Sequence, residues 1–461
     1  MDLKEHLVTT VKAYDQQLHR RVDLLLRTGK VLVESLADTN RVVRNMKRTA
    51  AYLGIPEEKL HINVSFTMLM VNVSDGDYSF TKFQRIEGHG VNMTAISEIS
   101  KLSWRAIEND YSLDKYEEEL EKIRTKKRNY APWQVAVGAG FACGGFCIQF
   151  GCDWMAFLYA SIAAIVGMRL RQKCNESGLN HYMGIAISAF VATLIAWATT
   201  LIPGEWTSTP WHPLLACALF IVPGVPLINF VDDMLDNYIQ VGIVRAVNTL
   251  LMIAAMAFGI AFAVKLCQVD NFFPTISMVP HHNYLEYAVA AAISAMGFSM
   301  IFNIQRRLLW VVAIGGIIAV CTRNFVNLGP STDNIGLDMG LIIGSFSGAI
   351  MVSLIAIKAV HWFHVPNHVL TIPSVIPMIP GVLMYRMLFG VINMNVQTVD
   401  QVTPLVKALE SGVNSGLIIL CVSLGVAIPN IFGRKYIAHS KNARLQEVLK
   451  ERKERGKFVE W

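Results

Sequence analysis

The chain has 461 residues, of which 53% are hydrophobic and only 16% are charged, and its formal net charge is +6. Charged residues gather in roughly the first 130 residues and in the last 28, so the basic balance comes from regions that flank an apolar middle part. This distribution argues against nucleic-acid binding and against an acidic substrate, and it indicates a membrane protein embedded in a lipid bilayer.

The first 130 residues predict a small soluble α+β domain. Its predicted elements are helices within residues 4–53, a hairpin of strands 61–73 and 78–86 around a turn at 74–77, and helices over 92–109 and 113–127. The chain opens without an apolar core segment, so no signal peptide is expected. We find no nucleophile–base pair, phosphate loop or HExxH motif, so we expect neither an enzyme nor a cofactor.

The apolar middle part divides into ten segments, most of them near the roughly 20 residues that a membrane-spanning helix requires. The predicted spans are 132–150, 154–170, 182–202, 212–231, 239–266, 285–304, 308–323, 338–361, 369–392 and 413–432. The chain is thereby divided into a domain (1–130), a first five-helix half (131–268), a second half (269–432) and a basic tail (433–461). The eight cysteines lie in or beside the apolar part without CxxC or metal-type spacing.

A proline–glycine pair interrupts two of these spans. Pro223-Gly224 lies in the fourth span and Pro380-Gly381 in the ninth. Proline removes a backbone donor and glycine adds freedom, so each helix is expected to bend or break there. Two kinked packing helices would be the simplest interpretation of one such pair. Two matching breaks instead indicate the binding site of a transporter, with the breaks facing each other near the middle of the membrane.

Five spans in each half require the second half to run through the membrane in the opposite sense. The expected fold is therefore a membrane all-α bundle of about ten helices, built as a 5+5 inverted repeat and preceded by the α+β domain. Lysine and arginine cluster before the first span and after the second, sixth, eighth and tenth spans. This asymmetry places both termini in the cytoplasm and the loop from Asn327 to Asp333 on the opposite side.

Acidic and amide residues follow the first break at helical spacing, namely Asn229, Asp233, Asp236 and Gln240, with Asp232 beside Asp233. Carboxylates there could bind and release protons, or receive the ammonium group of a substrate. An acidic, solvated connection between two spans is the alternative interpretation.

Two arginines fall at membrane depth. Arg386 lies five residues beyond Gly381, and Arg245 lies near Asn248 in the fifth span. Either guanidinium could hold a substrate carboxylate, although Arg245 could instead reach the interface and Arg386 could pair with another helix. His361, His364 and His368 straddle a span end and Pro366, which disfavours a metal site.

The order of these features resembles the threonine/serine exporter family of bacterial inner-membrane proteins over nearly the whole chain. The resemblance is carried by Val64 to Thr67, Arg85-Ile86, Gly90 to Met93, Ile221 to Gly224, Asn229, Asp232, Gly242 to Arg245, Pro373 to Gly381 and Tyr385-Arg386. It implies proton-driven export of small amino acids such as threonine and serine. In some relatives the halves are separate chains linked to export of dicarboxylates such as succinate. A passive channel and a membrane hydrolase are the remaining classes, and the sequence leaves a homo-oligomer open.

Overall fold

The computed structural model describes residues 3–74, 78–202, 206–269, 282–330, 335–393 and 402–454. The chain forms two compact units. The first, here called the N-terminal unit, comprises Met1–Lys127, Asp233–Val244 and Gly433–Trp461. The second, here called the helical unit, comprises Arg128–Asp232 and Arg245–Phe432. The four-part division expected from the sequence stays a prediction.

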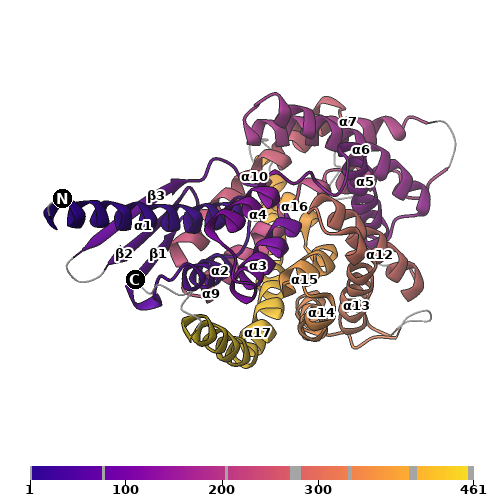
Figure 1. Cartoon of the computed structure of the whole chain (residues 1–461). Coiled ribbons are helices and arrows are strands. Elements are labelled where there is room, and N and C mark those ends of the chain that lie inside the picture. The colour runs from indigo at the N-terminus through magenta and orange to yellow at the C-terminus, as the bar shows by residue number, and fades with distance from the viewer. Residues whose placement is uncertain are drawn as a thin grey trace. The chain divides into compact units, whose positions relative to one another are not determined.

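The first stretch of the N-terminal unit contains a three-stranded antiparallel sheet in the order β1-β2-β3 and the helices α1 to α4 (Figure 1). Its elements are α1 (Leu3–Glu34), α2 (Thr39–Tyr52), the 3-10 turn η1 (Glu57–Lys59), β1 (Leu60–Val64), β2 (Met68–Ser74), β3 (Ser79–Arg85), α3 (Met93–Glu108) and α4 (Leu113–Thr125). Helix α1 packs on β2 and β3, and α2 and α3 pack beside it. The side chains of Leu69 and Val71 on β2 are fully buried, so one face of the sheet belongs to the core.

The predicted hairpin is wrong in one respect, because residues 61–73 form two strands and not one. A tight turn after Val64 separates β1 from β2: the Ser65 N–H donates to Met68 O at 2.8 Å, and the Ser65 hydroxyl accepts from the Met68 N–H at 3.0 Å. Serine readily forms such local bonds and so competes with a continuous ladder. The turn expected at 74–77 falls mainly on residues 75–77, which lie outside the described residues.

The helical unit is built from long helices and two interrupted ones. Its elements are α5 (Pro132–Gln149), α6 (Trp154–Glu176), α7 (His181–Thr199), α8 (Pro213–Ala216), η2 (Leu219–Ile221), α9 (Gly224–Leu235), α10 (Ile239–Leu266), α12 (Tyr284–Ile301), η3 (Arg306–Leu308), α13 (Leu309–Asn327), α14 (Leu341–Phe363), α15 (Asn367–Val375), η4 (Ile376–Met378), α16 (Gly381–Asn393) and α17 (Val402–Glu454). The last residues of α9, the first of α10 and the end of α17 belong to the N-terminal unit.

Among the described residues, seven helices are long and apolar enough to cross a membrane, and two bent pairs raise that number to nine. Each of the ten predicted spans coincides with a helix or a bent pair. Helix α5, which corresponds to the first predicted span, has 18 residues and is not among the nine. The chain is therefore a multi-pass membrane protein with seven to nine candidate spans.

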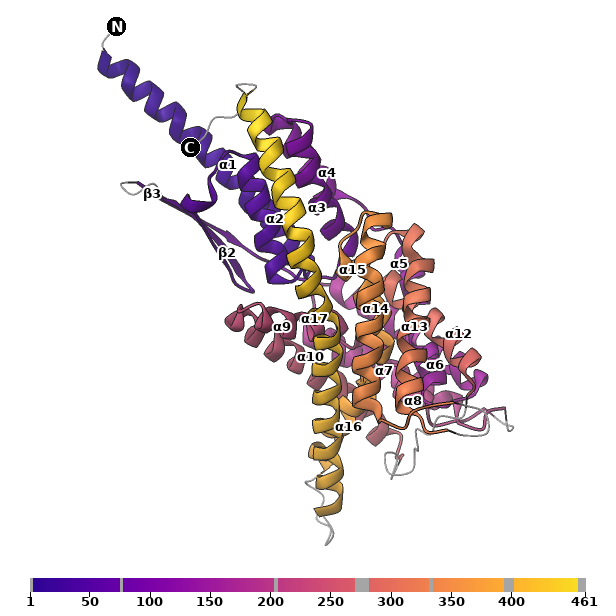
Figure 2. The same ribbon diagram turned by 90° about the horizontal axis from the view of Figure 1, so that it is seen from below.

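Helices of the unit pack along their lengths, as α12, α13 and α14 do in Figure 2. The pair formed by α5 and α12 illustrates the contacts. Phe146 meets Phe298 edge to face at 5.8 Å, and the Ser294 hydroxyl donates to Ala142 O at 3.2 Å. Aromatic packing and interhelical hydrogen bonds of this kind replace the hydrophobic drive that is missing inside a bilayer.

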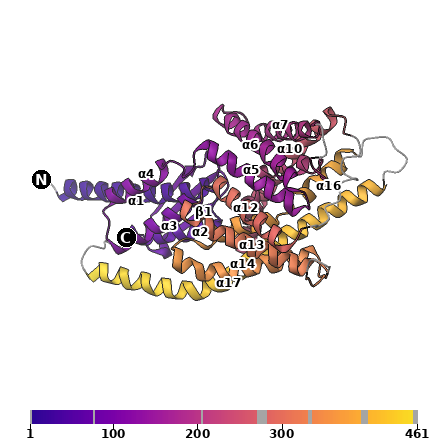
Figure 3. The same cartoon turned by 90° about the vertical axis from the view of Figure 1, so that its right-hand side faces the viewer.

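The basic tail is helical and belongs to the N-terminal unit. It forms the last part of α17, the long yellow helix in Figure 3. Arg452, which is 8% exposed, pairs with Asp110 at 2.7 Å and donates to Tyr52 O at 3.3 Å. Arg444 pairs with Glu108 at 2.6 Å. Two ion pairs therefore hold the tail against the end of α3 and the residues that follow it.

Candidate functional site

The two proline–glycine breaks have the same backbone arrangement. At the first, the pair formed by Pro213–Ile221 and Gly224–Leu235 is bent by 57°; at the second, Asn367–Met378 and Gly381–Leu388 are bent by 62°. Each break consists of a 3-10 turn, an extended residue and a new helix that starts at the glycine. The Gly224 N–H donates to Val222 O and the Gly381 N–H donates to Ile379 O, both at 2.8 Å. The predicted bending of both spans is confirmed.

The two breaks contact each other reciprocally. A Cβ placed on Gly224 would overlap Ile376 and lie 3.0 Å from Ile379 in the second break. A Cβ placed on Gly381 would lie 2.5 Å from Leu219 and 3.2 Å from Val222 in the first break. The prediction that the breaks approach each other is therefore confirmed, and a side chain at either glycine would displace the end of Ile376 or Leu219 in the other break.

One donor freed at the first break is satisfied by a cysteine. The Phe220 N–H, on the 3-10 turn, donates to Cys143 Sγ on α5 at 3.2 Å. Cys143 is fully buried, and its thiol lies 3.6 Å from Cys217 O. A break inside a membrane needs such a partner for its backbone groups.

Asn229 and Arg386 occupy matching positions, each five residues beyond its glycine. Asn229 is 1% exposed on α9, and Arg386 is half-buried on α16. The first helix thus carries a neutral amide where the second carries a positive charge. Both helices start at a break, so their N-terminal N–H groups and partial positive charge lie near these side chains.

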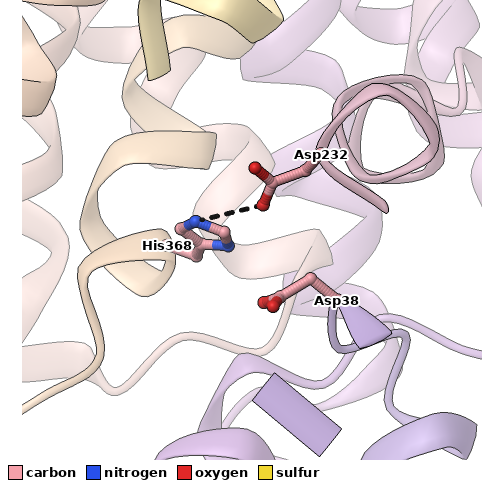
Figure 4. A group of neighbouring side chains, drawn as sticks. All are labelled: Asp38, Asp232 and His368. Atoms are coloured by element: carbon pink, nitrogen blue, oxygen red, sulfur yellow. Dashed lines mark ion pairs between the residues drawn. The ribbon is translucent and has the colours of Figure 1, made fainter. Parts of the chain in front are cut away.

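The first acidic residue after the break lies beside a histidine. Figure 4 shows His368, on α15, pointing toward Asp232, on α9, and their Nε2 and Oδ2 atoms are 3.5 Å apart. Both residues are buried, with exposed fractions of 7% and 2%. The pair joins the helix after the first break to the helix before the second. Sequence reasoning assigned His368 no role, because Asp232 is 136 residues away in the chain and no spacing pattern links them.

Asp233 and Asp236 lie in the N-terminal unit, in contrast to Asp232. The Thr39 N–H, at the start of α2, donates to Asp233 Oδ1 at 2.8 Å. The Asn40 amide donates to Asp236 Oδ2 at 2.6 Å. The three aspartates therefore do not form one cluster, and the expected acidic stripe is divided between two sets of partners. Gln240 is exposed.

Arg245 and Asn248 lie on α10 in the helical unit. Arg245 is 2% exposed. Asn248 accepts a hydrogen bond from the Tyr182 hydroxyl of α7 at 2.7 Å. Asn248 thus joins two helices through its side chain, and whether either residue meets a substrate stays a prediction.

Comparison with known proteins identifies relatives over most of the chain. The ThrE family model of threonine/serine exporters matches residues 23–267, and a second model, "Threonine/Serine exporter, ThrE", matches residues 287–432. The chain is 25% identical over 244 residues to the "Probable succinate transporter subunit YjjP" of Klebsiella aerogenes, which covers 53% of this chain and 92% of that one. The Escherichia coli protein of the same name is 25% identical over 243 residues, with 53% and 93% covered.

A third relative covers a larger share of this chain. The "Probable threonine/serine exporter" of Mycobacterium tuberculosis is 21% identical over 383 residues, which cover 81% of this chain and 70% of that one. No solved structure matches the chain.

Proposed function

Since the chain belongs to the threonine/serine exporter family and is a membrane transporter, we propose that it exports small amino acids such as threonine and serine in exchange for protons. The reciprocal contact of the two breaks carries this proposal. Interrupted helices at matching places in two halves form the substrate sites of several secondary transporters. A passive channel would not need them.

We assign the spans to two halves of five that run in opposite senses, with α5 as the first span. The two breaks support this repeat, because Leu219, Val222 and Gly224 match Ile376, Ile379 and Gly381 at a constant separation of 157 residues. Helix packing in the two halves follows a similar order: α5 with α6, α6 with α7, then α12 with α13 and α13 with α14.

The substrate carboxylate binds where α9 and α16 begin. Pro223-Gly224 and Pro380-Gly381 start the two helices there, and exposed helix N-termini attract anionic groups. Arg386 on α16 supplies a two-pronged donor matched to a carboxylate. The neutral Asn229 on α9 occupies the matching position and adds no second charge there. Arg245 and Asn248, on α10 of the helical unit, either contact neighbouring helices or bind the substrate.

Asp232 is the coupling group in this proposal, with His368 as its partner. Burial disfavours the charged form of a carboxylate, so a buried aspartate can take up a proton in one conformation and release it in the other. A proton drives export only if its binding favours one of the two conformations. The contact between Asp232 and His368 joins the two interrupted spans, so protonation there changes an interaction between them.

We place the protein in the bacterial cytoplasmic membrane with both termini in the cytoplasm. The asymmetry of lysine and arginine around the spans supports this orientation. Single cysteines are introduced at position 330 or in the tail, and a membrane-impermeant reagent is added to one side of the membrane. Only one of the two positions should react, because they lie on opposite sides. Labelling of both from the same side would remove the inverted repeat.

Export of small dicarboxylates is the second candidate substrate class. Two relatives bear the name of succinate transporter subunits, and the unit holds two arginines, Arg245 and Arg386, that could each bind a carboxylate. The substrate test uses proteoliposomes with an imposed pH gradient and labelled threonine, serine or succinate. Proton-driven movement of threonine or serine supports the first class, and movement of succinate alone supports the second. A transport rate that does not change with the pH gradient identifies a passive pore.

A further inference from the structure

The turn after the first interrupted span has a defined shape. Helix α9 ends with the Asn237 N–H donating to Met234 O at 3.1 Å and the Tyr238 N–H donating to Asp233 O at 2.8 Å. Asn237 has a φ of 67°, the left-handed conformation that asparagine tolerates at helix ends. Helix α10 begins immediately afterwards at Ile239. Residues Asp233 to Tyr238 therefore form a compact link between two candidate spans.

This link is bonded to the beginning of α2. The first N–H groups of a helix lack partners inside the helix, and here Asp38 accepts from the Arg41 N–H at 2.8 Å while Asp233 accepts from the Thr39 N–H at 2.8 Å. The side-chain bond from Asn40 to Asp236 adds a second attachment. Asp233 is 1% exposed. A buried carboxylate that accepts a helix-terminal N–H is stabilised in its charged form.

Charged side chains of α2 lie near the link. Arg41 pairs with Asp38 at 2.9 Å. Arg44 and Lys47 of α2 and the two aspartates act on Tyr238, whose pKa is raised mainly by burial. Positive side chains of α2 and a helix-terminal donor thus lie near the link.

We infer that Asp233 and Asp236 are positioning residues, which fasten the link between α9 and α10 to α2 and thereby fix the end of the first interrupted span. They are not the groups that carry protons. This inference rests on the proposed function, because it separates Asp233 and Asp236 from the coupling residue Asp232. It also gives the N-terminal unit a task in transport, since α2 provides the donors that hold the link.

The test compares asparagine and alanine at position 233. Asp233→Asn keeps an oxygen acceptor for the Thr39 N–H but cannot titrate near neutral pH, whereas Asp233→Ala removes the acceptor. In proteoliposomes we expect Asp233→Asn to export within about threefold of the wild-type rate, with an unchanged pH midpoint. Asp233→Ala should lower the rate on the order of tenfold, again without moving the midpoint. A shifted or flattened pH profile in Asp233→Asn would show that Asp233 titrates, and the inference would be overturned.

The second attachment allows a double-mutant cycle. Asn40→Ala and Asp236→Ala remove the two ends of one hydrogen bond, so the double variant should lose no more rate than the stronger single variant. Fully additive losses would mean that the two side chains act separately, which contradicts the inference.

Amide hydrogen exchange tests the attachment of the link to α2 without a measurement of transport. In the full-length protein, Asp233→Ala should accelerate amide exchange in a peptide that covers the start of α2, and Asp233→Asn should not. Unchanged exchange in Asp233→Ala overturns the inference even if export is lost. If the wild type exports nothing in response to a pH gradient but exchange responds as expected, the proposed function fails while the attachment of the link is supported.

Discussion

The two interrupted spans share one backbone and differ in chemistry. In both, a 3-10 turn leads through an extended residue to a helix that starts at glycine, and the bends are 57° and 62°. The first glycine is followed by Asn229 and Asp232, and the second by Arg386. The proline–glycine pair therefore specifies the geometry, because proline removes a backbone donor and glycine adds freedom whatever residues flank the pair. The helix after it specifies the charge, and that helix is acidic in one half and basic in the other.

Neutralising the acidic side should have the largest effect. Asp232→Asn keeps the size of the side chain but cannot exchange a proton, so export driven by a pH gradient should fall to the level of empty liposomes. Exchange of labelled for unlabelled substrate should persist, because it needs no net proton movement. Asp233→Asn, one residue away, is the matched control. Wild-type pH dependence in Asp232→Asn would remove this residue from coupling.

Neutralising the basic side should weaken binding and leave coupling intact. Arg386→Gln removes a charged donor to the substrate carboxylate and should raise KM about tenfold with an unchanged pH midpoint. Arg386→Lys keeps the charge but loses the two-pronged geometry, so its KM should lie between those of the wild type and Arg386→Gln. A normal KM in Arg386→Gln would indicate that the arginine pairs with another helix.

The contact between the breaks can be tested by measuring the unfolding free energy of variants. Gly224→Ala places a Cβ against the end of Ile376 and should cost about 1 kcal/mol of unfolding free energy. Ile376→Val removes the atom that obstructs it and alone costs about 0.5–1.5 kcal/mol. Because the two changes compensate, the double variant should be more stable than the sum of the single losses predicts. Strict additivity in thermal unfolding would show that the two breaks do not press on each other.

The N-terminal unit also includes two stretches from later in the chain, residues 233–244 and the basic tail. Arg452→Ala leaves Asp110 and Tyr52 O without their cationic donor and should destabilise that unit by about 1–2 kcal/mol, because Asp110 is 28% exposed and keeps access to water. Lys450→Ala, at an exposed position on the same helix, is the control. Equal melting temperatures for the two variants would mean that the tail contact adds no stability.

The smallest expected effect concerns acid. Hydrogen bonds from Arg20 and Arg27 lower the pKa of Glu117 below its ordinary value of 4.5. Because the folded pKa is the lower one, this stabilisation is present above pH 4.5 and is lost as the pH falls through the folded pKa. The pair is largely exposed, so it contributes less than about 1 kcal/mol. Glu117→Gln should therefore slightly flatten the acid limb of an unfolding curve, well below the pH range in which coupling is measured.

Local patterns made the elements of the fold predictable. Each predicted hydrophobic segment coincides with a helix or a bent pair, of which seven to nine are candidate spans among the described residues, and a proline–glycine pair located each bend to the residue. The turn after Val64 was missed because a serine side chain, and no glycine or proline, makes it. The sequence predicted α5 as a span like the others, but α5 is not among the helices that are long and apolar enough to cross a membrane.

Partners distant in the chain could not be predicted. His368 meets Asp232, and Cys143 accepts from the Phe220 N–H, only because the interrupted spans fold against other helices. Asp232, Asp233 and Asp236 were grouped by helical spacing, but the turn at Asn237 and the donors of α2 separate the last two from the first. Spacing on one helix shows which side chains share a face and gives no information on what that face meets.

The N-terminal unit is assembled from three stretches of chain, and the order of synthesis has a consequence for it. Its first stretch ends at Lys127 and its last begins at Gly433, so the 305 residues from 128 to 432 separate them. At about 5–20 residues per second, a ribosome needs roughly 15–60 s to make that interval. During this time the surface around Tyr52 and Asp110 lacks the helix that Arg452 anchors. The domain made first is thus completed last, after every span has left the ribosome.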